Sequence, residues 1–316
     1  MSRLTRSWRL QVWGCLTAAV LMLGSISTAY ADDYTRTKYP VVLVHGLFGF
    51  DKLAGAYDYW YGIPSSLRSG GANVIVVNVS SANSSEIRGD QVIRQLDTLR
   101  ALYGYTKFNL VGHSHGGPTA RYVAAVRPDL VASVTSMGSP HTGSKVADAV
   151  ASAAPEGSWT RTTVASFVNA FATVIEWFSG DNDPQDALGA LTSLSSSGAA
   201  AFNARYPQGR PTTWCGQGAA SVNGIRYYSM GGTSVLTNVL DLSDGALGTG
   251  SLFFGFEDND GLVGRCSSHW GVVLRDNYGW NHLDEVNQIL GLRGVFSSNP
   301  LSVYRAHANR LKNVGL

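Results

Sequence analysis

The sequence places one serine in a pattern that could make it a nucleophile. Residues 112–116 are Gly-His-Ser-His-Gly, with Ser114 at the centre. A β-type run at 108–111 precedes them, and a helix-like run at 118–126 follows. Strand, tight turn and helix are the context of a nucleophile elbow, which exposes a serine hydroxyl beside N–H groups that stabilise negative charge. A Gly- and Ser-rich loop could match these five residues by chance, so the flanking runs carry the prediction.

A serine hydroxyl needs a base to activate it, and the base needs a carboxylate to orient it. In a hydrolase built on such an elbow, the chain order is serine, then acid, then histidine. His282 lies in a loop before an expected helix and is the preferred base, with His269 second. The other histidines fit less well because of their positions: His115 within the turn, His141 before the acid, and His307 in a terminal helix, where we expect it at the surface.

The candidate acids lie together at Asp258 and Asp260. Asp260 precedes Gly261 in a turn that follows the apolar residues 251–256, which we expect to end a strand. We therefore prefer Asp260. Ordinary Asp-Gly turn chemistry is the alternative explanation for the same residues.

A second loop could supply N–H groups to a developing oxyanion. The apolar, β-branched run at 41–44 predicts a buried parallel strand, and His45-Gly46-Leu47 follows it. Such a hydrolase uses an N–H from this loop and one from the residue after the nucleophile. The candidate donors are Leu47 and His115, although a Gly-rich turn after a strand is common without any catalytic role.

Strands that alternate with helices must position these residues. Apolar runs predict strands at 41–44, 74–77, 108–111, 130–137 and 225–230. Helical spacing predicts helices at 84–102, 118–126 and 303–311, and the aromatic-rich stretch from 57 is expected to be helical up to Pro64. This alternation indicates an α/β protein with a mostly parallel, doubly wound sheet flanked by helices.

The first 31 residues resemble a secretory signal peptide. Arg3, Arg6 and Arg9 precede an apolar stretch, and residues 29–31 are Ala-Tyr-Ala, which predicts cleavage after Ala31 and a single domain over 32–316. An uncleaved anchor is the alternative, but the apolar run is short for a span. Losing three of the 24 basic residues leaves 21 against 22 acidic ones, so nucleic acid is not an expected partner.

Two cysteines, Cys215 and Cys266, remain after the leader is removed. They allow one pairing, which an oxidising compartment favours and which would stabilise the fold by ~4 kcal/mol in the chain-entropy model. Two free thiols are the alternative.

An amphipathic helix with few charges is expected around 164–178, where apolar residues recur at helical spacing. It could be a core helix, or a lid that covers the active site in water and turns outward at a lipid surface. The Gly- and Asp-containing residues 180–184 after it suit a mobile insertion.

Asp284 and Gln288 are four residues apart, so a helix would place them on one face. Their oxygens suit a hard cation such as calcium. A helix cap formed by Asn281 and Asp284 is the alternative, which spacing alone favours.

Together these stretches resemble the secreted Pseudomonas-type true lipases, which are triacylglycerol lipases of the α/β-hydrolase fold. The likeness lies in residues 39–46, 112–118, 126–130, 259–263 and 281–288, and it runs through essentially the whole chain after the leader. The resemblance implies a triad of Ser114, Asp260 and His282, with Leu47 and His115 as oxyanion donors. It also implies a Cys215–Cys266 disulfide and a lid within about 144–184.

The resemblance further implies one structural calcium ion, held by Asp241, Asp284, the Gln288 side chain and the Leu292 carbonyl. Family members leave the cell through the periplasm, using export machinery and often a membrane-anchored folding chaperone. The expected activity is triacylglycerol hydrolysis at a lipid–water interface through an acyl-enzyme. An esterase or acyltransferase acting on soluble esters, and a non-catalytic lipid-binding protein, are the alternatives.

Overall fold

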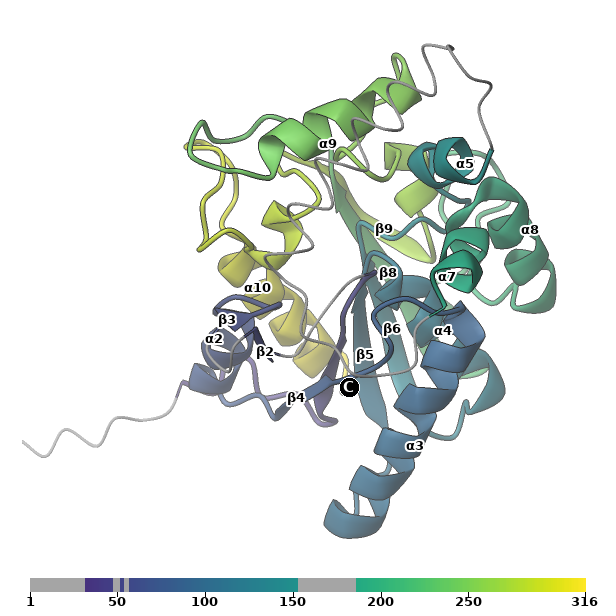
Figure 1. The fold of residues 1–316 in the computed structure, drawn as a ribbon. Coiled ribbons are helices and arrows are strands. Elements are labelled where there is room, and N and C mark those ends of the chain that lie inside the picture. The colour runs from purple at the N-terminus through teal and green to yellow at the C-terminus, as the bar shows by residue number, and fades with distance from the viewer. Residues whose placement is uncertain (1–31, 48–51, 54–56, 153–185) are drawn as a thin grey trace, which may run out of the picture. The chain divides into compact units, whose positions relative to one another are not determined.

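A seven-stranded sheet forms the centre of the protein (Figure 1). The computed structural model describes residues 32–47, 52–53, 57–152 and 186–316. Residues from Asp33 to Leu316 form one compact unit. The predicted leader and the predicted amphipathic helix at 164–178 lie outside the described residues. In the described part of the chain, no helix is both long and apolar enough to cross a membrane.

The sheet order is β4-β1-β5-β6-β8, with β7 and β9 both paired to β8. All neighbours run parallel except β7, which is antiparallel to β8. The strands are β1 (Val41–Val44), β4 (Val74–Val77), β5 (Phe108–His113), β6 (Val131–Met137), β7 (Ser221–Val222), β8 (Ile225–Gly232) and β9 (Val272–Tyr278). A separate two-stranded ribbon pairs β2 (Lys52–Leu53) with β3 (Tyr57–Asp58).

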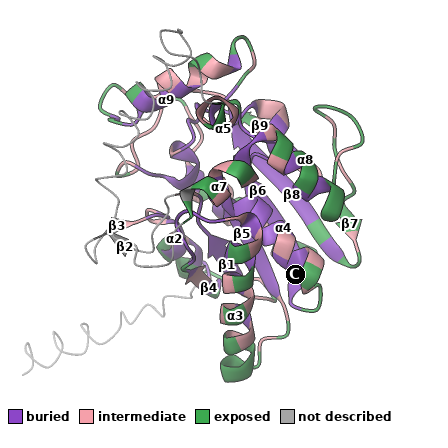
Figure 2. Ribbon diagram, turned by 45° about the vertical axis from the view of Figure 1, so that its right-hand side comes forward, coloured by how far each residue is buried: buried purple, intermediate pink, exposed green. Residues whose placement is uncertain are grey.

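Helices cover both faces of the sheet, because alternate residues of a buried strand point to opposite sides. In β1, Val41 and Leu43 pack with one set of helices, whereas Val42 and Val44 pack with another. The first set is α2 (Ile63–Ser69) and α10 (Pro300–Asn313), and the second is α3 (Ser85–Tyr103) and α4 (Gly116–Val126). Figure 2 shows the buried strands and the exposed outer side of α3. The predicted doubly wound α/β sheet is therefore confirmed.

Smaller helices lie beyond the carboxyl ends of the strands. They are α5 (Lys145–Ala151), α7 (Ala187–Leu194), α8 (Ser196–Arg205), α9 (Asp244–Ser251) and the 3₁₀ turns η1 (Leu252–Phe254), η2 (Arg265–Ser268) and η3 (Asp284–Val286). Of the predicted lid range, 153–184 lies outside the described residues. Cys215 and Cys266 form a disulfide that joins the loop before β7 to η2.

Two predicted elements are wrong. The helix expected to end at Pro64 begins at Ile63, after Gly62 with φ 72°, because proline suits the first turn of a helix and not its interior. Residues 251–256 contain the end of α9 and η1 instead of a strand. Their apolar run is too short to distinguish a strand from a helical turn.

The surface position expected for His307 is also wrong. His307 lies on the inner side of α10, where its Nε2 is 2.7 Å from Thr135 Oγ1 of β6. Burial, followed by the charge of Arg310, lowers the pKa of His307 to about 3. The histidine is therefore neutral in the folded protein at ordinary pH.

We predict that His307 makes the protein acid-sensitive. The pKa of His307 is lower in the folded protein than the ordinary value of 6.5. Its contribution to the free energy of unfolding is therefore complete above pH 6.5 and is lost as the pH falls from there towards about 3. At about pH 5 the free energy of unfolding should be about 2 kcal/mol lower than at neutral pH because of this residue. Urea titrations of the native protein and His307→Asn at both pH values measure this, with the exposed Ser302→Ala as control. Equal pH dependence in native protein and His307→Asn would contradict the prediction.

Candidate active site

Ser114 occupies a strained turn between β5 and α4. Its φ is 53°, and its N–H donates to Met137 O at 2.9 Å. Gly112 and Gly116 make the turn possible, because a Cβ on either would lie 2.1 Å from a carbonyl oxygen, that of Gly116 or Val44 respectively. A non-glycine residue with positive φ is uncommon and needs support from its surroundings. The turn has the geometry that the Gly-x-Ser-x-Gly pattern predicts.

Asp260 and His282 are joined by two hydrogen bonds. His282 Nδ1 lies 2.8 Å from Asp260 Oδ2, and the His282 N–H donates to Asp260 O at 2.9 Å. Both side chains are buried. Asp260 Oδ1 accepts the N–H groups of Leu262 and Val263, so the carboxylate is fixed from both sides. An acceptor on Nδ1 leaves Nε2 as the nitrogen that can take a proton.

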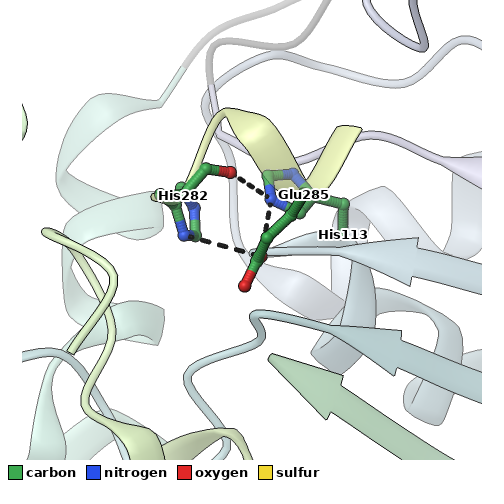
Figure 3. A group of neighbouring side chains, drawn as sticks. All are labelled: His113, His282 and Glu285. Carbon is green, nitrogen blue, oxygen red and sulfur yellow. Dashed lines mark hydrogen bonds and ion pairs between the residues drawn. The ribbon is translucent and has the colours of Figure 1, made fainter. Parts of the chain in front are cut away.

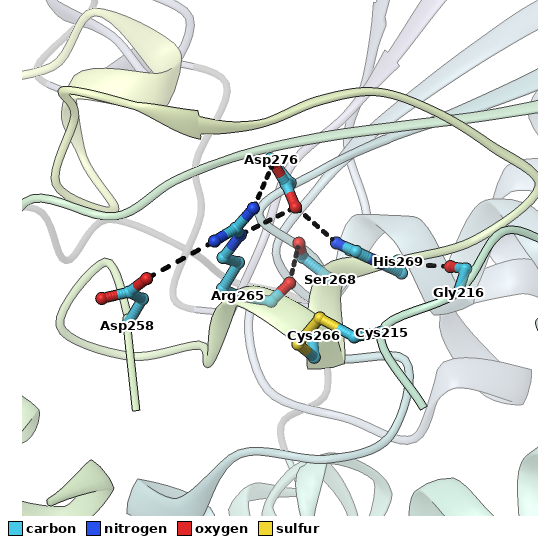
Figure 4. Close-up of a disulfide and its surroundings, with 8 residues drawn as sticks. All are labelled: Cys215, Gly216, Asp258, Arg265, Cys266, Ser268, His269 and Asp276. Atoms are coloured by element: carbon cyan, nitrogen blue, oxygen red, sulfur yellow. Dashed lines mark hydrogen bonds and ion pairs between the residues drawn. A yellow bond between two sulfur atoms is a disulfide. The ribbon is translucent and has the colours of Figure 1, made fainter. Parts of the chain in front are cut away.

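The alternative candidates have other partners. Asp258 is exposed and pairs with Arg265, and His269 lies between Asp276 and the carbonyl of Gly216 (Figure 4). Arg265 also pairs with Asp276, beside the disulfide. This network ties η2, which follows the Asp260 loop, to β9. It occupies both ring nitrogens of His269.

A hydrogen-bond chain connects the loop after β1 with the loop of His282. Gly46 N–H donates to the Tyr59 hydroxyl at 3.0 Å, and that hydroxyl lies 2.5 Å from His113 Nδ1. His113 Nε2 is 2.9 Å from His282 O. Because a carbonyl only accepts, Nε2 carries the proton and Nδ1 accepts from Tyr59. Burial, followed by the charge of His282, lowers the pKa of His113 well below its usual value, which keeps the ring neutral.

His113, His282 and Glu285 converge closely enough to hold a metal ion, with candidate ligand atoms within 4.8 Å of one another (Figure 3). In the protein as it stands, His113 Nε2 donates its proton to His282 O and also lies 3.2 Å from Glu285 Oε2. Glu285 is fully buried, and its Oε1 accepts the N–H of Gly232. Burial, followed by the charge of Asp260, raises the pKa of Glu285 well above its usual value. The other oxygen, Oε2, lies 4.0 Å from His282 Nδ1, farther than Asp260 Oδ2 at 2.8 Å.

The two proposed oxyanion donors lie at the carboxyl ends of β1 and β5. Among the described residues, the N–H groups of Leu47 and His115 have no acceptor in the protein. The His115 side chain is buried with Nε2 3.0 Å from Ser85 Oγ, so only its backbone is available to a substrate. Donors that are already oriented and unpaired are what a developing oxyanion requires.

Arg88 fixes the loop that contains Leu47. Its guanidinium is buried and donates to the carbonyls of His45, Gly46 and Ser80, at 2.5, 3.2 and 2.8 Å. These bonds hold the loop after β1 against α3. The Leu47 N–H therefore belongs to a backbone that is clamped before any ligand arrives.

The predicted cation ligands are only partly brought together. Asp241 Oδ2 and Asp284 Oδ1 are buried without hydrogen-bond partners, and the charge of Asp241 contributes to raising the pKa of Asp284 to about 7, after burial. Gln288 instead donates its amide to the carbonyls of Asp58 and Tyr59. Leu292 lies in the turn closed by its N–H and Ile289 O.

The expectation that Asp284 and Gln288 share a helical face is wrong. The helix is only the short 3₁₀ turn η3, and Asn287, Ile289 and Leu290 all have positive φ. The hydrogen bonds of the alternative cap are present, because Asn281 Oδ1 accepts the Asp284 N–H at 2.8 Å and the Asn281 N–H donates to Asp284 Oδ2 at 3.3 Å. They do not cap a helix, since η3 begins directly after Leu283, which has no side-chain cap. These bonds use Oδ2 and leave Oδ1 of Asp284 without a partner.

Known proteins resemble this chain in sequence and in fold. The α/β-hydrolase fold family matches residues 39–233. A triacylglycerol lipase of Vibrio cholerae is 54% identical, covering 90% of this chain and 91% of the relative. A triacylglycerol lipase of Pseudomonas fragi is 44% identical, covering 90% of this chain and all of the relative.

The chain belongs to the α/β-hydrolase family, alongside these triacylglycerol lipases. Solved structures agree on the fold. The mature Bacillus licheniformis lipase BlEst2 superposes with a TM-score of 0.61 at 18% identity, covering 87% of this chain and 93% of that one. Lipase 1 of Pelosinus fermentans gives 0.58 at 17% identity, covering 87% and 99%.

Sequence reasoning missed four residues of this hydrolase site: Tyr59, Arg88, His113 and Glu285. Arg88 had a signal, since it precedes Val92 by one helical turn on the apolar face of α3. A charged residue on a buried face must have partners. The other three had no comparable signal, because their partners are distant in the sequence.

We predict that Tyr59 acts as a positioning residue in this hydrolase. Tyr59→Phe removes the acceptor of Gly46 N–H and the donor to His113 Nδ1, so kcat should fall about tenfold, the equivalent of one hydrogen bond. The measurement is kcat and KM on a dissolved ester, with the melting temperature recorded for each variant. Tyr105→Phe, far from the site, is the control. A kcat equal to that of the native protein would show that the hydrogen-bond chain does not position His282.

Proposed function

We propose that the protein is a triacylglycerol lipase that hydrolyses esters at a lipid–water interface through Ser114, Asp260 and His282. The Asp260–His282 pair, with 2.8 Å between Nδ1 and Oδ2, carries the proposal. It lies at the edge of the sheet where the elbow presents Ser114, whose neighbour His113 contacts His282. The names of the relatives support the substrate class.

In this mechanism, Ser114 Oγ attacks the ester carbonyl carbon while His282 Nε2 takes the hydroxyl proton. The carbonyl π electrons move to oxygen, where the N–H groups of Leu47 and His115 stabilise the charge; such a donor contributes about 3–4 kcal/mol. Asp260 holds the tautomer of His282 and stabilises its imidazolium form. The tetrahedral intermediate collapses, and His282 returns the proton to the departing alcohol. Water then repeats these steps on the acyl-enzyme and releases the fatty acid.

The experiment that tests this function is fatty-acid release from a long-chain triglyceride emulsion. Ser114→Ala should lose at least about 10⁴-fold of the rate, because the proposed mechanism forms the acyl-enzyme on this hydroxyl. Ser69→Ala, an exposed serine on α2, is the control and should retain full activity. Activity on a dissolved short ester without activity on the emulsion would favour an esterase. No turnover of either substrate by folded protein would favour a lipid-binding protein.

We further propose a structural calcium ion held by Asp241 and Asp284, with Gln288 and Leu292 completing the site after the Gln288 amide turns. Two buried carboxylate oxygens without partners are costly, and a divalent cation would satisfy both. The ion would supply charge compensation to the loop that follows His282. Among the protein's own groups, Asn281 links this region to α9 by donating to Asp244 at 2.8 Å.

Removing calcium should destabilise the protein. We expect the melting temperature of the chelated protein to be roughly 5 °C lower than that of the protein saturated with calcium. Calcium added back in excess of the chelator should restore it. Asp241→Asn and Asp284→Asn should abolish this response, whereas Asp258→Asn, which alters an exposed carboxylate, should retain it. A native protein whose melting temperature ignores the chelator would contradict the site.

We also propose that the protein is secreted. Residues 1–31 would act as a signal peptide, and passage through the periplasm would involve export machinery and a membrane-anchored folding chaperone. The Cys215–Cys266 disulfide supports an oxidising destination. The segment within 144–184 is proposed as a lid.

A further inference from the structure

Exposed apolar side chains gather near the candidate active site. Nine of the 17 large hydrophobic side chains that are exposed in the described residues lie between Leu236 and Phe296. They fall in three segments, 236–242, 252–256 and 290–296, together called the apolar rim below. Val239, Phe256 and Phe296 are fully exposed. A concentration of this kind marks an interaction surface, since isolated exposed apolar residues are scattered in most proteins.

Hydrogen bonds join the first and third segments of the apolar rim, and the second segment follows α9, which begins beside the first. Asn238 Nδ2 donates to Arg293 O at 3.0 Å, which joins the first segment to the third. Asp244, at the start of α9, accepts the N–H groups of Thr237 and Asn238, and the second segment follows α9 directly. Figure 1 shows the loop before α9 beside the yellow segment that follows η3.

The apolar rim has almost no exposed charge. Its ionisable residues are Asp241, which is buried, and Arg293, which is half-buried. An acidic or basic partner would find no complementary charges here. An uncharged surface of hydrocarbon and ester groups matches the rim, and such a surface is favoured because it removes apolar side chains from water.

The rim is also continuous with the candidate catalytic loops. Phe256 precedes Asp260 by four residues, and Leu290 follows His282 by eight. Contact through these segments would bring a lipid surface to the two loops that carry the acid and the base. A substrate molecule leaving that surface would have a short path to Ser114.

We propose that the apolar rim docks the protein on uncharged lipid surfaces, with side chains such as Phe256 and Phe296 entering the lipid. The proposal rests on the proposed lipase function and adds a lipid contact outside the segment 144–184. Burial of one such side chain in lipid strengthens the partitioning of the protein from water to the lipid surface about tenfold or more. The rim thus supplies surface affinity, whereas Ser114, Asp260 and His282 supply the chemistry.

The test separates surface binding from catalysis. Hexadecane droplets contain no ester bond, so co-flotation with them measures docking alone. The rim variant combines Val239→Ser, Phe256→Ser and Phe296→Ser. A control of the same size combines Leu102→Ser, Tyr103→Ser and Val126→Ser, at the C-terminal ends of α3 and α4, where the parent side chains are also large, hydrophobic and exposed, by 68%, 63% and 40%.

We expect the rim variant to bind droplets at least 100-fold more weakly, and to lose emulsion activity while hydrolysing a dissolved short ester within twofold of the native rate. The control should behave as the native protein in all three assays. Native droplet binding by the rim variant would overturn the proposal. So would a native dimer that the rim variant converts to a monomer while droplet binding persists, since the occupant would then be a second copy. Native protein that floats with droplets but hydrolyses no ester would instead contradict the proposed function and leave docking supported.

Discussion

The hydrogen bonds from Gly46 through Tyr59 and His113 to His282 O are the constraint on which the site depends. They join the loop after β1, the strand that ends at the elbow, and the loop of the candidate base. Each bond fixes one proton position, because a carbonyl accepts and a neutral imidazole has one donor. The chain fixes the relative positions of these three loops, and a misplacement of about 1 Å can cost 10²-fold in rate.

Burial makes this arrangement rigid and also determines its protonation. His113 is neutral because burial and the nearby charge of His282 oppose a second proton. Burial and the charge of Asp260 raise the pKa of Glu285 well above its usual value. Glu285 Oε2 lies 4.0 Å from His282 Nδ1, so the carboxylate hydrogen-bonded to His282 is that of Asp260, at 2.8 Å. Low dielectric strengthens that interaction.

Local patterns predicted the turn and five of the seven strands of the sheet, but neither β7 nor β9. The runs at 41–44 and 74–77 became strands with those limits, and the glycines around Ser114 were required by close backbone contacts. Asp260 was preferred over Asp258 because it precedes Gly261 in a turn. Long-range contacts could not be predicted: His307 appeared exposed until α10 packed on β6, and Gln288 left the expected helical face because positive φ values interrupt the helix. Tyr59 lies 54 residues from its partner His113, which no local spacing reveals.

The most direct test of the central claim is covalent labelling by a serine-reactive phosphonate, followed by peptide mapping. We expect a single adduct on Ser114, because the proposed mechanism makes this hydroxyl the nucleophile that His282 activates. Labelling should become much slower in His282→Gln, whereas His269→Gln should retain it. An adduct on another serine, or no adduct on folded native protein, would contradict the account.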